Sequence, residues 1–155
     1  MKSSKGFSTF LHRDDLMPVI RQGIFISIIF GMLAGAIQLL LSYMFDLSLQ
    51  WFMMFAIAYF LAKRISQTQL ISHIGFQVFA VIFLWFSFYI MNVTALFGLF
   101  FVNHVSELSI YLRFLNPIPF FTFLNPFRAS FFNVMNLIEV IFFIASSIYA
   151  YRAVK

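Results

Sequence analysis

Residues 19–45, which read VIRQGIFISIIFGMLAGAIQLLLSYMF, decide the fold of this chain. Apart from Arg21 near the start, none of these residues carries a formal charge. A helix rises about 1.5 Å per residue, so about 20 apolar residues cross the ~30 Å hydrocarbon core of a bilayer. The stretch is longer than that minimum and therefore predicts one membrane span that is tilted in the bilayer.

The composition of the whole chain also indicates a membrane protein. Of its 155 residues, 63% are hydrophobic and 10% are charged, whereas a soluble domain has about 45–50% apolar and about 25% charged residues. The net charge of +5 comes from basic residues at the ends of apolar runs, which is typical of topology signals rather than of a nucleic-acid-binding face. The absence of cysteine excludes disulfides, thiolate catalysis and cysteine metal sites.

Further apolar runs follow the first span. One run is flanked by Trp51 on one side and by Lys63 and Arg64 on the other. Another run extends from 70 to 102 without a formal charge, and its length exceeds the ~20 residues that one crossing needs. The sequence predicts an all-α integral membrane protein with a single membrane domain over 1–155, a four-transmembrane-helix bundle with an extra outer interfacial helix and loop. Its expected segments are a cytoplasmic N-terminal segment at 1–17, spans at 19–45, 48–64, 70–94 and 130–151, and an outer interfacial helix with a Pro-rich loop at 95–128.

The positive-inside rule gives the orientation of these spans. With both termini in the cytoplasm, only Arg113 and Arg128 of the 10 Lys and Arg residues lie outside. A five-span alternative, in which 95–115 also crosses, gives the same split of basic residues. Hydropathy disfavours it, because that crossing would carry Glu107 and Arg113 through lipid at about 2.5–3.5 kcal/mol for each central charge. We expect a multi-pass protein of the cell membrane with N- and C-termini in the cytoplasm.

Small residues recur at every fourth position of the first span. Gly23, Ser27, Gly31 and Gly35 form one stripe, which includes a GxxxG motif. Small side chains let two helix backbones approach closely, and this matters in lipid because the hydrophobic effect does not drive helices together there. The stripe predicts a helix-packing surface, either for another helix of this chain or for the same helix of a second copy.

Glu139 is the most prominent polar residue within the apolar runs, and Asn133 and Asn136 precede it at three-residue steps. An ionisable residue inside a span is by default a candidate functional site, for example for a proton or a cation. The alternative is a protonated or hydrogen-bonded side chain that holds helices together. Candidate partners at a similar depth are Gln38, Ser87, Tyr89 and Asn92.

Residues 114–127, FLNPIPFFTFLNPF, contain the phrase FLNP twice. Each proline removes a backbone donor and biases the preceding Asn away from helix. Asn side chains also bond nearby backbone groups as turn formers. We expect a twice-used turn that seats this aromatic loop in the membrane interface, where it faces lipid or a partner protein.

The sequence carries no enzyme signature. It has no HExxH motif, no P-loop, no Rossmann glycine pattern and no supported Ser-His-Asp set. His104 and Glu107 lie one helical turn apart and could share a metal or act on lipid at the outer interface. They lack a third ligand, so a solvated polar face is the simpler interpretation. We expect no enzyme, no metal and no cofactor.

The stretches GMLAGAI at 31–37, FAIAYFLAKR at 55–64 and FFIASSIYAYRAVK at 142–155 resemble small four-span bacterial membrane proteins of unknown function. In that group a glycine-rich first helix precedes a short second helix with a basic end, and the last helix ends in an alanine-tyrosine-basic phrase. The second helix here has Ala56 and Ala58 where glycine is frequent. The resemblance implies the fold and, because the group has no established activity, no mechanism.

These observations favour a non-enzymatic accessory or partner subunit of a membrane assembly. The alternative is a small oligomeric channel or a proton- or ion-coupled carrier that uses Glu139. The expected partners are the lipid bilayer and another membrane protein or a second copy, bound through the first span or the outer aromatic loop. No nucleic-acid partner is expected.

Overall fold

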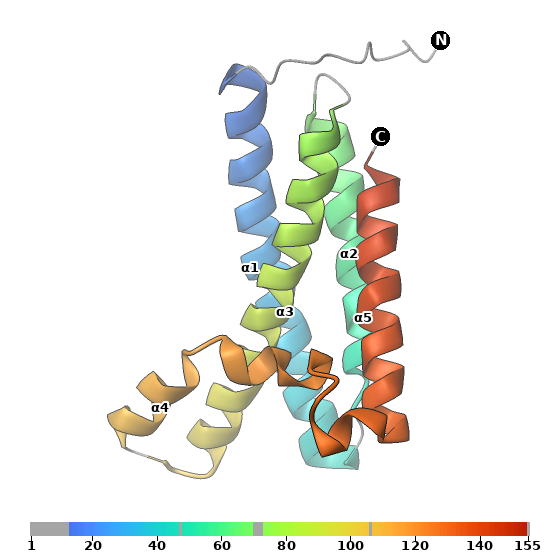
Figure 1. Ribbon diagram of the computed structural model, residues 1–155. Coiled ribbons are helices and arrows are strands. Elements are labelled where there is room, and N and C mark those ends of the chain that lie inside the picture. Colours follow the sequence, from blue (N-terminus) through green and yellow to red (C-terminus); the bar gives the residue numbers. More distant parts are fainter. Residues whose placement is uncertain (1–12, 47, 70–72, 106, 155) are drawn as a thin grey trace.

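The computed structural model describes residues 13–46, 48–69, 73–105 and 107–154 (Figure 1). All regular secondary structure in this part of the chain is helical. In chain order the elements are α1 (Arg13–Phe45), α2 (Gln50–Thr68), α3 (Ile74–Val102), α4 (Leu108–Phe114), the 3₁₀ helices η1 (Ile118–Leu124) and η2 (Ala129–Phe132), and α5 (Val134–Ala153).

The four long helices α1, α2, α3 and α5 lie side by side and alternate in direction (Figure 1). α1 packs mainly along α3, and α2 packs mainly along α5. The start of α1 and the end of α5 therefore lie at the same end of the bundle (Figure 1). Between the helices is an apolar core, which includes the fully buried side chains of Leu61, Phe76, Leu84 and Met91.

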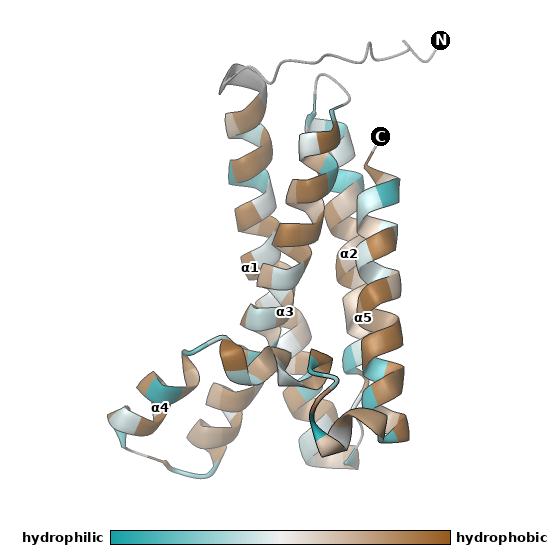
Figure 2. Ribbon diagram, in the orientation of Figure 1, coloured by the Kyte–Doolittle hydropathy of each residue, from teal (hydrophilic) through white to brown (hydrophobic). Residues whose placement is uncertain are grey.

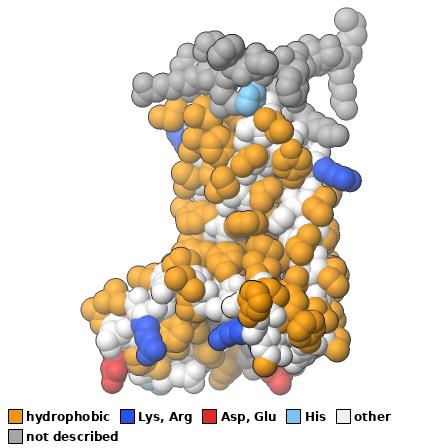
Figure 3. Space-filling view, viewed as in Figure 1, with side chains coloured by type: hydrophobic (Ala, Val, Ile, Leu, Met, Phe, Trp, Pro, Cys, Tyr) orange, Lys and Arg blue, Asp and Glu red, His pale blue; other side chains and the backbone are white. Residues whose placement is uncertain are grey.

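Three of the helices are long and apolar enough to cross a membrane: Leu16–Phe45 within α1, α3 and α5. α2 is not among them, since its last two turns carry Lys63 and Arg64 together with polar residues. Hydrophobic residues dominate α3 and α5, and polar residues gather at helix ends and connections (Figure 2). The surface in view is apolar between two charged ends (Figure 3). The fold is that of an all-helical membrane protein.

The third long helix, α3, continues to Val102 and does not end near residue 94. The stretch from 94 to 102 contains no proline and no charge, so nothing in it stops a helix. The helix ends at Asn103, and the next residue, His104, takes a left-handed φ of 55° that turns the chain. The helix therefore continues past the predicted end of the third span, and the position of the membrane boundary along it stays a prediction.

The last helix, α5, begins at Val134, after the predicted start of its span at residue 130. Asn133 caps it, because its Oδ1 accepts the backbone N–H of Met135 at 3.1 Å. The residues just before the cap form η2 instead. Glu139 consequently lies in the second turn of α5, close to the connecting segment, residues 115–133, which joins α4 to α5.

α4 and residues 100–102 at the end of α3 together form a lateral arm that projects sideways from the bundle (Figure 1). The ring of Tyr111 lies 5.2 Å from that of Phe97 and 5.4 Å from that of Phe100, measured between centroids. The ring of Phe114 lies 5.5 Å from that of Phe100. Aromatic contacts thus fold α4 back onto the end of α3.

The doubled FLNP phrase forms the same turn twice, as the sequence predicted. Asn116 Oδ1 accepts the N–H of Ile118, and Asn125 Oδ1 accepts the N–H of Phe127, each at 3.0 Å. Part of the segment between them packs into the bundle, because the ring of Phe121 lies 5.5 Å from that of Phe88 in α3. The two turns therefore return the chain from the lateral arm to the bundle.

Candidate functional site

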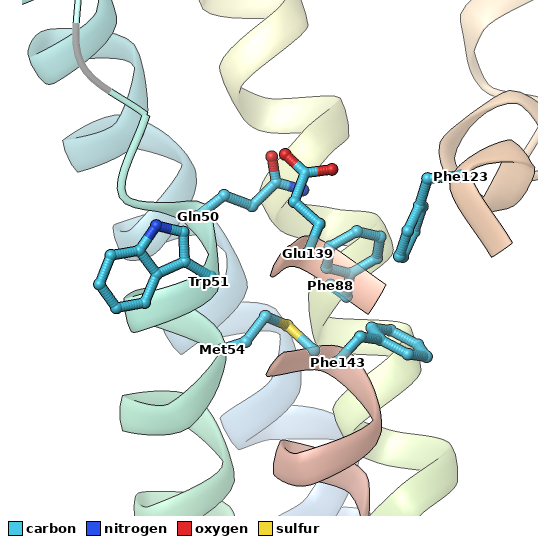
Figure 4. Close-up of a pocket in the computed structure, with 7 residues that line it drawn as sticks. All are labelled: Gln50, Trp51, Met54, Phe88, Phe123, Glu139 and Phe143. Carbon is cyan, nitrogen blue, oxygen red and sulfur yellow. The ribbon is translucent and has the colours of Figure 1, made fainter. Parts of the chain in front are cut away.

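Glu139 lines a small, partly open space, here called the Glu139 cavity, at the end of the bundle near the connecting segment (Figure 4). The cavity volume is about 10 Å³, which is about the room one water molecule needs. It has no room for an organic substrate. The lining residues are Gln50, Trp51, Met54, Phe88, Phe123, Glu139 and Phe143.

Four elements contribute side chains to the walls of this cavity, and most of these side chains are aromatic. Phe88 of α3, Phe123 of η1 and Phe143 of α5 form a three-way cluster with centroid distances of 5.3–5.6 Å. Trp51 of α2 packs on Phe142 of α5 at 4.7 Å. The connecting segment therefore closes the cavity through the ring of Phe123.

Gln50 is the one amide among the residues that line the Glu139 cavity, and no Lys, Arg or His lines it. As the first residue of α2, Gln50 extends toward the same end of the cavity as the Glu139 carboxyl group (Figure 4). A carboxyl group beside one amide can hold a proton or a hydrogen bond. Apart from Glu139 itself, the described lining provides no nucleophile and no base.

The structure does not bring the predicted partners of Glu139 into its cavity. Gln38 instead donates to Ser48 Oγ at 3.1 Å and accepts from the N–H of Leu49 at 3.2 Å, so it ties α1 to the following turn. Tyr89 donates to the carbonyl oxygen of Leu115 at 2.6 Å. Ser87 is fully buried, and its Oγ has no hydrogen-bond partner within the described residues.

Asn133 and Asn136 have structural contacts and do not line the Glu139 cavity. Asn133 is the cap of α5 described above. Asn136 Nδ2 donates to the carbonyl oxygens of Phe123 at 3.1 Å and Phe131 at 3.2 Å. Asn136 thereby fixes the connecting segment to α5 and holds Phe123 over the cavity.

A second and much larger hollow, here called the amide cleft, lies between α1, α3, the start of α2 and η1. Its volume is about 420 Å³. Gln50 lines both hollows and donates from Nε2 to Asn92 Oδ1 at 3.3 Å. The polar lining consists of Gln38, Ser42, Tyr43, Gln50 and Asn92.

Sequence reasoning did not predict the amide cleft. Gln38 and Asn92 were considered only as partners of Glu139, and Gln50 was given no role beyond its place in the predicted span at 48–64. A signal was present in the first span, where Gln38 and Ser42 lie one helical turn apart near the end of an otherwise apolar run.

The small-residue stripe of α1 faces α3. Ser27 Oγ donates to the carbonyl oxygen of Phe83 at 2.9 Å. A Cβ atom at Gly31 would approach the carbonyl oxygen of Ser87 to 2.8 Å, and a Cβ atom at Gly23 would come closer still to the ring of Phe83. Gly35 contacts α3 in the same way, so the stripe is occupied within the chain and leaves no open groove for a second copy.

His104 and Glu107 are both exposed, beyond the end of α3 and just before α4. Within the described residues, no group of three or more His, Cys, Asp or Glu side chains could hold a metal ion. Their positions fit a solvated polar surface.

Comparisons with protein families, with curated proteins and with solved structures find no match to this chain. The resemblance to small four-span bacterial membrane proteins therefore stays a prediction.

Proposed function

We propose that this chain is a non-enzymatic subunit of a larger membrane assembly. It would cross the cell membrane four times, with both termini in the cytoplasm. The observation that carries this proposal is the lateral arm, which projects from the bundle and leaves an apolar face without a partner in the described structure.

The apolar face of the lateral arm consists of leucines at helical spacing. Leu108, Leu112 and Leu115 are 71%, 59% and 44% exposed, and steps of three and four residues put them on one side of α4. Phe101 at the end of α3 is 80% exposed. A short helix held away from the bundle is poorly placed to contribute to the chain's own core, but it suits contact with a neighbouring protein.

Three helices have the hydropathy of membrane spans, and the proposal adds α2 as the fourth. α2 has 19 residues and is about 28 Å long, which is nearly the thickness of the hydrocarbon core. One face is buried in the bundle at Met54, Ile57 and Leu61. Lys63 and Arg64 are exposed near its end, where long basic side chains can reach the lipid headgroups.

The charge distribution supports cytoplasmic termini. The long helices alternate in direction (Figure 1). Arg21 in the first part of α1 and Lys63 and Arg152 in the last parts of α2 and α5 therefore belong to the same end of the bundle. Arg113 and Arg128 lie at the other end, in the lateral arm and the connecting segment. The positive-inside rule places the first group in the cytoplasm.

A photoreactive amino acid introduced at Leu112 tests the subunit role. After irradiation of native membranes, we expect a covalent adduct with another membrane protein, identified by mass spectrometry. The matched control is Ile28, an exposed apolar residue on α1, where we expect lipid adducts only. Lipid adducts alone at both positions would contradict the proposal.

The alternative, a channel or carrier that uses Glu139, rests on a half-buried carboxyl group without a basic side chain in its cavity lining. The cavity volume of about 10 Å³ argues against it, because a conducting pathway needs continuous space for water or an ion. The subunit role is therefore preferred.

A further inference from the structure

The amide cleft has the form of a ligand site, and the proposed subunit role does not use it. Its volume of about 420 Å³ falls within the range of about 300–1,000 Å³ found for small-molecule pockets. Such pockets combine apolar walls with a few polar groups, and the cleft has both. The question is which class of molecule fits this lining.

The polar groups of the cleft are largely held in place by other contacts. Gln38 is fixed by Ser48 and Leu49, as described above. Asn92 Nδ2 donates to the carbonyl oxygen of Phe88 at 2.9 Å, while its Oδ1 accepts from Gln50. The hydroxyl groups of Ser42 and Tyr43 belong to exposed residues at the open side of the cleft. A ligand would therefore meet positioned amides and accessible hydroxyls.

The remaining residues that line the cleft are apolar. They include Leu39 of α1, Leu96 and Leu99 of α3, and Phe120 of η1. The ring of Phe120 lies 5.8 Å from that of Tyr89, whose hydroxyl group bonds the connecting segment. Polar and apolar walls side by side suit an amphiphilic molecule.

The depth of the cleft indicates which part of a lipid it would meet. The apolar part of α1, Leu16–Phe45, has 30 residues and is about 45 Å long, the thickness of a bilayer with its headgroups. Gln38 lies about two turns, roughly 10 Å, before the end of α1. That distance corresponds to the boundary between hydrocarbon and headgroups, where the glycerol of a lipid lies.

The lining also discriminates by charge, because none of its ten residues is Lys, Arg, Asp or Glu. A phosphate group would enter without a basic partner, and burying an unpaired charge is strongly unfavourable. Amides and hydroxyls instead match hydroxyl groups, to which they both donate and accept.

We propose that the amide cleft binds an uncharged glycerolipid with free hydroxyl groups, of the diacylglycerol or glycosyl-diacylglycerol class. The hydroxyl groups bond Gln50, Asn92 and the side chains at the open side. The first part of an acyl chain lies along Leu39, Leu96 and Leu99. This site is independent of the lateral arm, so the two proposals can fail separately.

Lipid retention by the full chain, measured by native mass spectrometry from mild detergent, tests the site. The three lipids are diacylglycerol, glucosyl-diacylglycerol and phosphatidylglycerol, the last of which adds a phosphate to a hydroxyl-bearing headgroup. We expect the two uncharged lipids to be retained in preference to phosphatidylglycerol. Equal or stronger retention of phosphatidylglycerol would overturn the proposal.

Two sets of variants locate the binding. The double variant Ser42→Ala, Tyr43→Phe should lower retention of the uncharged lipids at least about fivefold, the loss expected for two hydrogen bonds. Its matched control is Ser109→Ala, Tyr59→Phe, which removes the same groups from exposed positions outside the cleft. Equal retention by the two double variants would overturn the assignment.

The second set blocks the space instead of removing hydrogen bonds. Ala95→Phe adds a ring to the cleft lining and should also reduce retention, whereas Ala36→Phe on the exposed face of α1 should not. Circular dichroism identifies any variant that fails to fold, and in that case the Ser42 and Tyr43 variant still decides the outcome.

Discussion

Glu139 shares its cavity with one amide and a set of apolar side chains, and this lining determines how it should respond to substitution. No basic side chain lines the Glu139 cavity, so removing the carboxylate breaks no salt bridge there. Breaking a buried ion pair costs about 3–5 kcal/mol, but that loss requires a partner charge. The position of Glu139 beside Gln50 therefore fits a hydrogen-bonding role.

Replacement of Glu139 by glutamine should leave both stability and permeability nearly unchanged. Glutamine keeps the shape and can bond Gln50, so we expect the free energy of unfolding to change by less than about 1 kcal/mol. Thermal unfolding in detergent, followed by circular dichroism, measures this. The control is Glu107→Gln at an exposed position.

The same variant separates the subunit role from transport. We expect liposomes with the wild-type chain or the Glu139→Gln variant to show the same ion and proton flux as empty liposomes. A flux that the wild type supports and the variant lacks would establish a carrier in place of a subunit.

For single residues, the sequence identified which side chains to consider as candidate sites more successfully than it predicted which residues those side chains contact. Glu139 was identified because a charge in an apolar run is conspicuous, and the turn-forming role of Asn116 and Asn125 followed from the prolines after them. The partners of Glu139 were not predictable, because depth along a span does not tell which way a helix faces. Gln50 was missed for this reason, since it is the first residue of α2 and extends into the bundle.

At the scale of helices, the contact between α1 and α3 is set by the small-residue stripe. A side chain at Gly35 would lie 2.5 Å from the carbonyl oxygen of Met91, and a backbone atom cannot move without shifting α3. Gly98 differs, because its neighbour is the end of the Leu39 side chain, which can rotate. The two glycines should therefore respond differently to the same substitution.

Gly35→Ala should destabilise the chain by about 1–3 kcal/mol through overpacking, and Gly98→Ala should cost less. The free energy of unfolding in mixed detergent measures both. Gly75→Ala in the first turn of α3 is the control, and it should be neutral or slightly stabilising because alanine is the better helix former. Equal losses at Gly35 and Gly98 would show that the backbone contact is not the cause.

The ends of the helices were less predictable than their existence. The predicted end of the third span at residue 94 came from the thickness of a bilayer. A helix, however, continues until a residue stops it, and α3 stops only where Asn103 and His104 turn the chain. The start of α5 depends on the cap made by Asn133, which sequence reasoning had grouped with Glu139. Local hydrogen bonds, rather than hydropathy, set both ends.

At the scale of the whole molecule, the role of α2 decides the topology. α1, α3 and α5 have the length and hydropathy of spans, so either three or four helices cross. If α2 also crosses, α3 and α1 cross in the same direction, and the lateral arm lies outside the cell. If α2 remained on the outer surface, α3 would have to cross in the direction opposite to α1, against the parallel packing of α1 and α3 in this fold, and the lateral arm would lie in the cytoplasm (Figure 1). In the four-span arrangement, the end of α2 lies in the cytoplasm and the lateral arm lies outside. In the three-span arrangement, both positions are reversed.

Single cysteines distinguish these arrangements, because the chain contains no cysteine of its own and the wild type supplies a clean background. Gln67→Cys near the end of α2 and Ser109→Cys in α4 both replace exposed residues. In intact cells, a membrane-impermeant maleimide should label Ser109→Cys and should reach Gln67→Cys only after permeabilisation. The reverse pattern would mean that α2 does not cross, and it would place the lateral arm, with its proposed partner, on the cytoplasmic side.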